Sequence, residues 1–189
     1  MQNPKEFLWE HKYQPYAIAD CILPKEMRTT FAKIIKDQNI GNYLFESTNP
    51  GTGKTTCARI LANEINAGKG KPIEIDAASN NGVDDVREII NDAKFKALDA
   101  EYKVYILDEC HMFSTGAWNA MLKLIEEPPA KTIFIFCTTD PQKIPATILS
   151  RVQRFDFQRI TYHGILNRLI YIMEDGEGRQ YERAALEYI

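Results

Sequence analysis

A glycine-rich segment between a short apolar strand and a helix constrains the fold of this chain more than any other feature. It reads Thr48-Asn49-Pro50-Gly51-Thr52-Gly53-Lys54-Thr55 and follows the apolar run Tyr43-Leu44-Phe45. Apolar residues then recur at helical spacing, at Cys57, Leu61 and Ile65. A glycine loop that ends in lysine and threonine between a strand and a helix is typical of a phosphate-binding loop.

Each residue type in this loop has a physical reason. Gly51 and Gly53 allow backbone N–H groups to turn inward around phosphate oxygens, and the following helix directs its positive end at the same charge. Lys54 is expected to reach the β- and γ-phosphates, and the Thr55 hydroxyl to bind Mg²⁺. The other residues expected to contact the nucleotide are Asn49, Pro50, Thr52 and Thr56. Thr48 replaces the usual first glycine, and the alternative is a glycine turn that caps a surface helix.

Hydrophobic spacing between about residue 25 and residue 157 predicts alternating strands and helices. Short apolar runs predict five strands, near residues 43–45, 73–75, 104–107, 133–137 and 155–157. Apolar residues at intervals of three and four predict helices near residues 27–35, 57–65, 83–97 and 114–125. This alternation predicts an α/β fold with a parallel five-stranded sheet flanked by helices.

The C-terminal residues follow a purely helical pattern. We therefore expect one domain over residues 1–160 and the start of a helical domain over residues 161–189. About 30 residues are too few to bury a core alone, so we expect the chain to end inside this second domain.

Two carboxylates end the apolar strand that precedes them, in the run Val104-Tyr105-Ile106-Leu107-Asp108-Glu109. In a phosphate-loop protein, Asp108 is expected to hold the Mg²⁺ shell and Glu109 to act as general base for the attacking water. The alternative is a pair of solvated loop carboxylates. His111 follows closely and is expected to be structural or coupling rather than a metal ligand.

Two further polar positions lie near the ends of later elements. A hydroxyl of Thr138-Thr139-Asp140 is placed to bond the γ-phosphate or the attacking water beside Glu109, although threonines at strand ends are common. Arg151 precedes the last strand, and its spacing alone is equally that of a surface arginine.

Composition excludes several classes of protein. The 23 basic and 26 acidic side chains give a net charge of −3, which rules out a broadly basic nucleic-acid coat but not a local DNA-binding face. No apolar run approaches the ~20 residues that span a bilayer, and Met1 to Glu10 has no signal-peptide pattern. The four cysteines stand far apart, as in a cytoplasmic protein with reduced thiols: Cys21, Cys57, Cys110 and Cys137.

Over nearly its whole length the sequence resembles the AAA+ ATPase subunits of DNA polymerase clamp loaders. Four runs are similar to the bacterial DNA polymerase III gamma/tau subunit: Ile73 to Arg87, Lys103 to Glu109, Leu122 to Pro129 and Thr138 to Pro145. The N-terminal runs Lys12 to Pro15 and Cys21 to Pro24 resemble phage and eukaryotic-type clamp loader subunits more. The resemblance implies an AAA+ P-loop NTPase followed by the start of an α-helical lid domain.

This resemblance also implies roles for single residues. Thr139 matches the sensor 1 position, and Arg151 matches the arginine finger that reaches the ATP of a neighbouring subunit. Tyr13 and Pro15 match the segment that lines the adenine pocket. The implied partners are other clamp loader subunits in a ring-shaped, pentameric assembly, a sliding clamp and primer-template DNA, and no membrane.

Three departures from the family pattern bear on these expectations. Val152 replaces the cysteine that follows the finger. A short Gly/Lys loop, Asn66 to Lys71, stands where gamma/tau carries a four-cysteine zinc module, so the expected cofactors are ATP and Mg²⁺ without zinc. The sequence also lacks the sensor 2 arginine and the collar, and a fragment or a phage origin would fit these features.

The function implied is that of an ATPase that opens a sliding clamp and loads it on primer-template DNA. The alternatives are another AAA+ DNA-remodelling ATPase, such as a branch-migration helicase, and a nucleotide-binding stator that does not hydrolyse ATP. For DNA contacts we expect Asn80 and Asn81 to open a helix that carries Arg87 and Lys94 on one face. The alternative is that Arg87 and Lys94 pair with acidic neighbours on a solvated helix.

Overall fold

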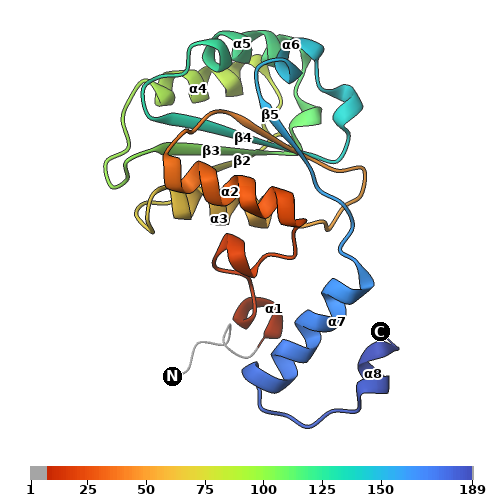
Figure 1. Ribbon diagram of the computed structural model, residues 1–189. Coiled ribbons are helices and arrows are strands. Elements are labelled where there is room, and N and C mark those ends of the chain that lie inside the picture. The colour runs from red at the N-terminus through yellow and green to blue at the C-terminus, as the bar shows by residue number, and fades with distance from the viewer. Residues whose placement is uncertain (1–7, 189) are drawn as a thin grey trace.

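The computed structural model describes residues 8–188, and a parallel five-stranded sheet lies at its centre (Figure 1). Residues 1–7, which include most of the stretch without a signal-peptide pattern, lie outside the described residues. The strand order is β2-β3-β4-β1-β5, and every pairing is parallel. This confirms the predicted α/β fold. The strands are β1 Tyr43–Glu46, β2 Ile73–Asp76, β3 Lys103–Asp108, β4 Thr132–Thr138 and β5 Gln153–Asp156.

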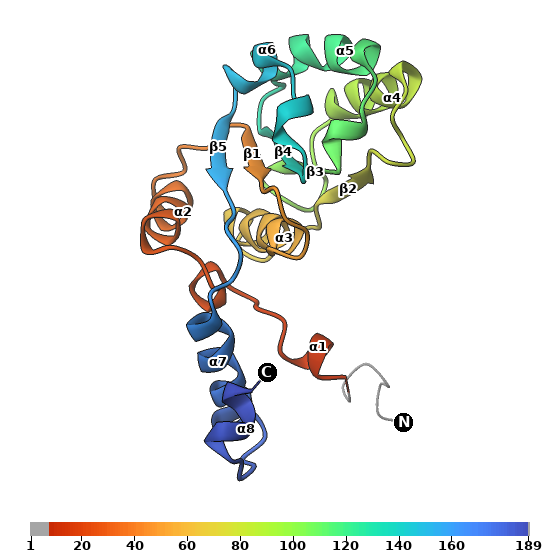
Figure 2. The ribbon, with the colours of Figure 1, turned by 90° about the vertical axis from the view of Figure 1, so that its right-hand side faces the viewer.

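Helices cover both faces of the sheet, as Figures 1 and 2 show. Helices α2 (Lys25–Asp37) and α3 (Lys54–Ile65) lie on one face, and α4 (Val83–Ala93) and α5 (Thr115–Glu126) lie on the other. Two apolar clusters result. Phe31, Phe45 and Leu61 belong to the first, and Trp118 and Phe136 to the second. Strands β1, β3 and β4 are almost fully buried because both of their faces are covered.

The helix predicted over residues 83–97 is shorter than its apolar pattern. It ends at Ala93, because the apolar residues Phe95 and Leu98 that would extend its stripe are exposed and find no core to cover. The expectation that Asn80 and Asn81 open this helix is wrong, since Gly82 is its N-cap. The main-chain N–H of Asn80 and its side-chain amide both donate to the carbonyl of Asp76, which keeps this segment in a turn.

The last strand was also predicted two residues late. Strand β5 begins at Gln153 and lies at the edge of the sheet, beside β1. Its residues Gln153, Arg154 and Asp156 are exposed, so no apolar run marks its start in the sequence. Arg154 instead binds the carboxylate of Glu46 on β1, at 2.7 Å.

The C-terminal elements extend away from the sheet (Figures 1 and 2). Helix α7 (Tyr162–Tyr171) continues into the π-helical turn η5 (Ile172–Gly176), and α8 (Arg183–Glu187) follows. The short helix α1 (Trp9–Lys12) leads into a segment without regular structure, Tyr13 to Ala17, and the turn η2 (Ile18–Asp20). The remaining elements are η3 Cys110–Met112, η4 Pro141–Lys143 and α6 Ala146–Leu149. Within residues 8–188 no helix has the length and apolar character to cross a membrane.

Candidate active site

The phosphate loop joins β1 to α3 at the carboxyl edge of the sheet. Gly51 and Gly53 have φ angles of 70° and 87°, in the left-handed region that favours glycine. A Cβ added to either would meet no atom within 4 Å, so the space beside the loop is open. Gly53 caps α3 without a side-chain hydrogen bond, which leaves N–H groups of the first helical turn available to an anion.

Two buried polar side chains of this loop call for a ligand. Lys54 is 6% exposed, and none of the ion pairs formed within residues 8–188 includes it. The Thr52 hydroxyl is buried and has no hydrogen-bond partner in the same part of the chain. A buried ammonium group without a counter-ion is costly. Its charge therefore fits an anionic phosphate group.

The two carboxylates predicted from the sequence lie beside this loop. Asp108 is the last residue of β3, and its Oδ2 accepts a hydrogen bond from the Thr55 hydroxyl at 2.9 Å. A hydroxyl and a carboxylate in contact are the hard oxygen donors that Mg²⁺ prefers. Thr55 and Asp108 thus fit the magnesium site that the sequence predicted.

Glu109 is held by Thr139, which follows β4, and by His111, which lies in the turn η3 that follows Glu109 itself. Its backbone is left-handed, with φ 47°, and its Oε2 accepts a hydrogen bond from the Thr139 hydroxyl at 2.8 Å. His111 Nδ1 lies 3.3 Å from the same oxygen and 3.1 Å from the buried Thr138 hydroxyl. The predicted neighbourhood of Glu109 and Thr139 is present, and His111 and Thr138 extend it.

A cavity beside the phosphate loop is suited to a nucleotide base. It encloses about 270 Å³, and both polar and apolar side chains line it. The phosphate loop contributes Thr52, Gly53 and Thr56, while Tyr13 and Pro15 come from the N-terminal segment. Leu23 and Ile160 add apolar surface. Tyr13 and Pro15 therefore line a cavity next to the loop, as their resemblance to the adenine-pocket segment implied.

Other predicted residues lie apart from this centre. Arg151 donates to the Thr147 carbonyl at 2.6 Å and pairs with Glu126 at 2.7 Å, and neither partner belongs to the phosphate loop. Arg87 forms an exposed ion pair with Asp84 at 2.7 Å. The remaining residues assigned to DNA are Asn80 and Asn81 in the turn before α4 and Lys94, which bonds Asn91.

The four cysteines are free and buried. Burial raises the pKa of Cys110 and of Cys137 above that of an ordinary thiol, so neither is a ready thiolate ligand or nucleophile. The Gly/Lys loop from Asn66 to Lys71 turns through Gly68 and Gly70, which both have positive φ.

This fold and site define an AAA+ P-loop protein. The Thermotoga maritima RuvB Holliday junction branch migration motor superposes with a TM-score of 0.72 at 17% identity, over 93% of this chain and 58% of that chain. A DNA polymerase III gamma subunit-related protein of Thermotoga maritima gives 0.63 at 22% identity, over 85% and 57% of the two chains. At these identities the two structures establish the fold alone.

Within that class, the chain is similar to gamma/tau subunits of DNA polymerase III. DNA polymerase III subunit tau of Bacillus subtilis is 43% identical over 94% of this chain and 35% of its own length. The tau/gamma subunit of Haemophilus influenzae is 36% identical over 93% and 28% of the two lengths. The family model described as DNA polymerase III, delta subunit, matches residues 71–161. The chain thus spans about a third of the length of the curated relatives it matches.

Proposed function

We propose that this chain is the ATP-hydrolysing part of a sliding-clamp loader subunit, which opens the clamp and places it on primer-template DNA in the cytoplasm. The observation that supports this most is the convergence of Lys54, Thr55, Asp108 and Glu109 at one edge of the sheet. The gamma/tau relatives support the clamp-loader assignment.

Each site residue then has one chemical task. The loop N–H groups and Lys54 bind the β- and γ-phosphates, and Thr55 and Asp108 hold Mg²⁺, which neutralises phosphate charge when bound. Glu109 accepts the proton of the attacking water as general base, and Thr139 orients its carboxylate through their hydrogen bond. The nucleotide base of ATP lies in the cavity that Tyr13, Pro15 and Thr56 line.

The arginine finger acts between subunits in this proposal. Arg151 bonds Thr147 and Glu126 of its own chain, on the α5–α6 side of the molecule. A ring-shaped, pentameric assembly would bring Arg151 of one copy to the γ-phosphate held by its neighbour. The guanidinium fork then stabilises charge that develops in the transition state.

Two other functions are the alternatives. A branch-migration motor is the first, because RuvB has the same fold and the fold alone does not separate the two functions. A stator that binds ATP without hydrolysing it is the second, and the matched delta-subunit model covers residues 71–161 without the phosphate loop. Neither accounts for both the intact loop and the gamma/tau relatives at 34–43% identity.

The deciding experiment measures ATP hydrolysis by the assembled subunits with defined DNA. Primer-template DNA together with the sliding clamp should raise the rate more than either component alone. A branch-migration motor would instead respond to a four-way junction without the clamp. A stator would bind ATP and show no turnover that depends on Glu109.

A further inference from the structure

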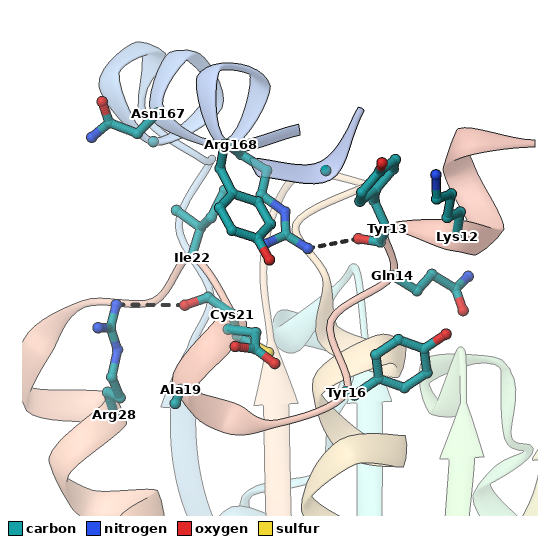
Figure 3. Close-up of a pocket in the computed structure, with 14 residues that line it drawn as sticks. Lys12, Tyr13, Gln14, Tyr16, Ala19, Cys21, Ile22, Arg28, Asn167 and Arg168 are labelled. Carbon is teal, nitrogen blue, oxygen red and sulfur yellow. Dashed lines mark hydrogen bonds between the residues drawn. The ribbon is translucent and has the colours of Figure 1, made fainter. Parts of the chain in front are cut away.

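The N-terminal segment is bound to the end of the π-helical turn by a compact group of contacts. The Tyr13 hydroxyl donates to Glu177 Oε1 at 2.7 Å, and the Lys12 ammonium lies 2.7 Å from the same oxygen. Arg168 of α7 donates to the main-chain carbonyl of Tyr13 at 2.7 Å, a bond visible in Figure 3. We call these residues, together with Gly176, the clasp. It joins residues that are more than 150 positions apart in the sequence.

Gly176 lets the Tyr13 ring approach the backbone of the turn. A Cβ built on Gly176 would lie 2.5 Å from Cε1 and from the hydroxyl oxygen of Tyr13, which is closer than real Cβ contacts. The φ of Gly176 is not positive, so the backbone alone does not call for glycine here. Glycine at this position leaves the space that the Tyr13 ring occupies.

The charges of the clasp support one another. The Glu177 side chain is only 15% exposed, and it receives hydrogen bonds from both Lys12 and Tyr13. These two donors lower the pKa of Glu177, and Glu177 in turn raises the pKa of Lys12. The Tyr13 hydroxyl, whose pKa is raised by burial and by Glu177, stays a neutral donor. The clasp is therefore intact at neutral pH.

The clasp borders the cavity that suits the nucleotide base. Tyr13 and Arg168 line both this inner cavity and an outer one of about 690 Å³, which Figure 3 shows between the N-terminal segment and α7. The segment that follows Tyr13 carries Pro15, another wall residue. The phosphate loop borders the same inner cavity through other residues, Thr52, Gly53 and Thr56. Release of Tyr13 would thus open the base side of the site and leave the phosphate side intact.

We propose that Glu177 and Gly176 are positioning residues for nucleotide binding, which fix Tyr13 as a wall of the base cavity and so join the C-terminal helices to the nucleotide. This inference rests on the proposed nucleotide function. It adds that the affinity for the base portion depends on a contact between the two ends of this chain. The phosphate portion does not depend on that contact.

The test compares ATP with inorganic tripolyphosphate, which has the phosphates without the base. Tyr13→Phe removes the hydroxyl that donates to Glu177, and Glu177→Gln removes the negative charge that binds Lys12, both with little change in size. Gly176→Ala adds a Cβ that displaces the Tyr13 ring. Each variant should weaken ATP binding about three- to tenfold and leave tripolyphosphate binding unchanged. Glu174→Gln is the matched control, because Glu174 lies on the same turn η5 and accepts a hydrogen bond from Tyr181, which follows that turn. This variant should bind both ligands like the parent.

Three outcomes would separate the possibilities. Parental ATP affinity in all three clasp variants would overturn the inference. Equal weakening of ATP and tripolyphosphate would also overturn it, because the clasp would then support the whole site rather than the base cavity. If the parent chain bound neither ligand, the proposed nucleotide function itself would be wrong.

Discussion

Glu109 is the residue whose backbone and side chain are both specialised in this site. A left-handed backbone at a residue other than glycine costs about 1–2 kcal/mol, and here it turns the chain sharply just after β3. The carboxylate then meets Thr139 from β4's end and His111 from the following turn. This places the proposed base on the edge where the phosphate loop also lies.

The role proposed for Arg151 affects turnover in the assembly but not ATP binding by the isolated chain. Arg151→Ala should leave the ATP affinity of the isolated chain unchanged, because the hydrogen bonds and ion pair of Arg151 within residues 8–188 go to Thr147, Ser150 and Glu126, outside the phosphate loop. In the proposed ring the same variant should lower turnover about 10³-fold or more, because the proposal has Arg151 act on the ATP of the neighbouring subunit. Nucleotide titration and steady-state hydrolysis measure the two effects.

The matched control for this prediction is Lys131→Ala. Lys131 is another exposed cation in an ion pair, with Glu101 at 2.8 Å. It should change neither binding nor turnover. Loss of ATP affinity in isolated Arg151→Ala would instead indicate that Arg151 acts within its own chain or supports the fold.

Sequence motifs predicted the local part of the site and missed the distant part. The run from Asn49 to Thr56 is contiguous, so its chemistry can be recognised without knowing the fold. Asp108 was recognisable because it ends a buried strand. The contact of Tyr13 with Glu177 had no local signal, because no local pattern pairs the two residues and the chain between them forms the whole sheet.

At the scale of elements, Asp92 connects α4 to β3. Its Oδ2 lies 2.8 Å from the Lys103 ammonium and accepts a hydrogen bond from the Tyr105 hydroxyl. Lys103, with a smaller contribution from Tyr105, lowers the pKa of Asp92 below the usual value of an aspartate. The ion pair of Asp92 with Lys103 therefore stabilises the fold once Asp92 is ionised.

The sign of the pH dependence follows from this lowered pKa. The contribution of Asp92 should be complete above its unfolded pKa of about 3.9 and should vanish as the pH falls through the lower folded value. Because Asp92 is half exposed, Asp92→Asn should cost at most about 1 kcal/mol at pH 7. Denaturant unfolding at pH 7 and at successively lower pH measures this effect. The difference in the free energy of unfolding between parent and variant should become smaller as the pH falls.

A double-mutant cycle with Lys103→Ala isolates the pair. At pH 7 the coupling energy should show that Asp92 and Lys103 stabilise the fold together, and it should decline toward zero in acid. A coupling energy that stays constant across this range would mean that the charge of Asp92 does not account for its coupling with Lys103.

Element boundaries show where apolar patterns mislead. The stripe that runs past Ala93 to Ala97 suggested a longer α4, yet Phe95 and Leu98 are exposed in the loop. Strand β5 was located two residues late because its first residues are polar. Buried strands such as β3 and β4 were located well, since burial on both faces imposes a continuous apolar run.

Binding of primer-template DNA by Arg87 is a prediction for the assembled molecule. Arg87 lies on α4 in an exposed ion pair with Asp84. This pairing is the one expected if Arg87 belongs to a solvated helix face and does not bind DNA. An exposed pair of this kind is weak, so a phosphate can compete for the guanidinium. In the full assembly, Arg87→Ala should weaken primer-template binding equally for all sequences. It should also lower the salt slope by about 1 for each DNA phosphate that Arg87 neutralises in the parent.

Lys131→Ala serves as the control for DNA binding as well, because it removes one cation without touching α4. Binding curves at several salt concentrations give the slope for each variant. An unchanged slope for Arg87→Ala, accompanied by a lower melting temperature, would place the DNA face elsewhere and assign Arg87 to the helix surface.

In the proposed function, Lys54 binds ATP and Glu109 hydrolyses it. ATP affinity and single-turnover hydrolysis, measured in the assembly for two variants, separate these roles. Glu109→Gln should keep parental affinity and lose hydrolysis by about 10²–10⁴-fold, since only the base is removed. Lys54→Ala, checked for parental folding, should lose binding itself. Hydrolysis at the parental rate by Glu109→Gln would contradict the account.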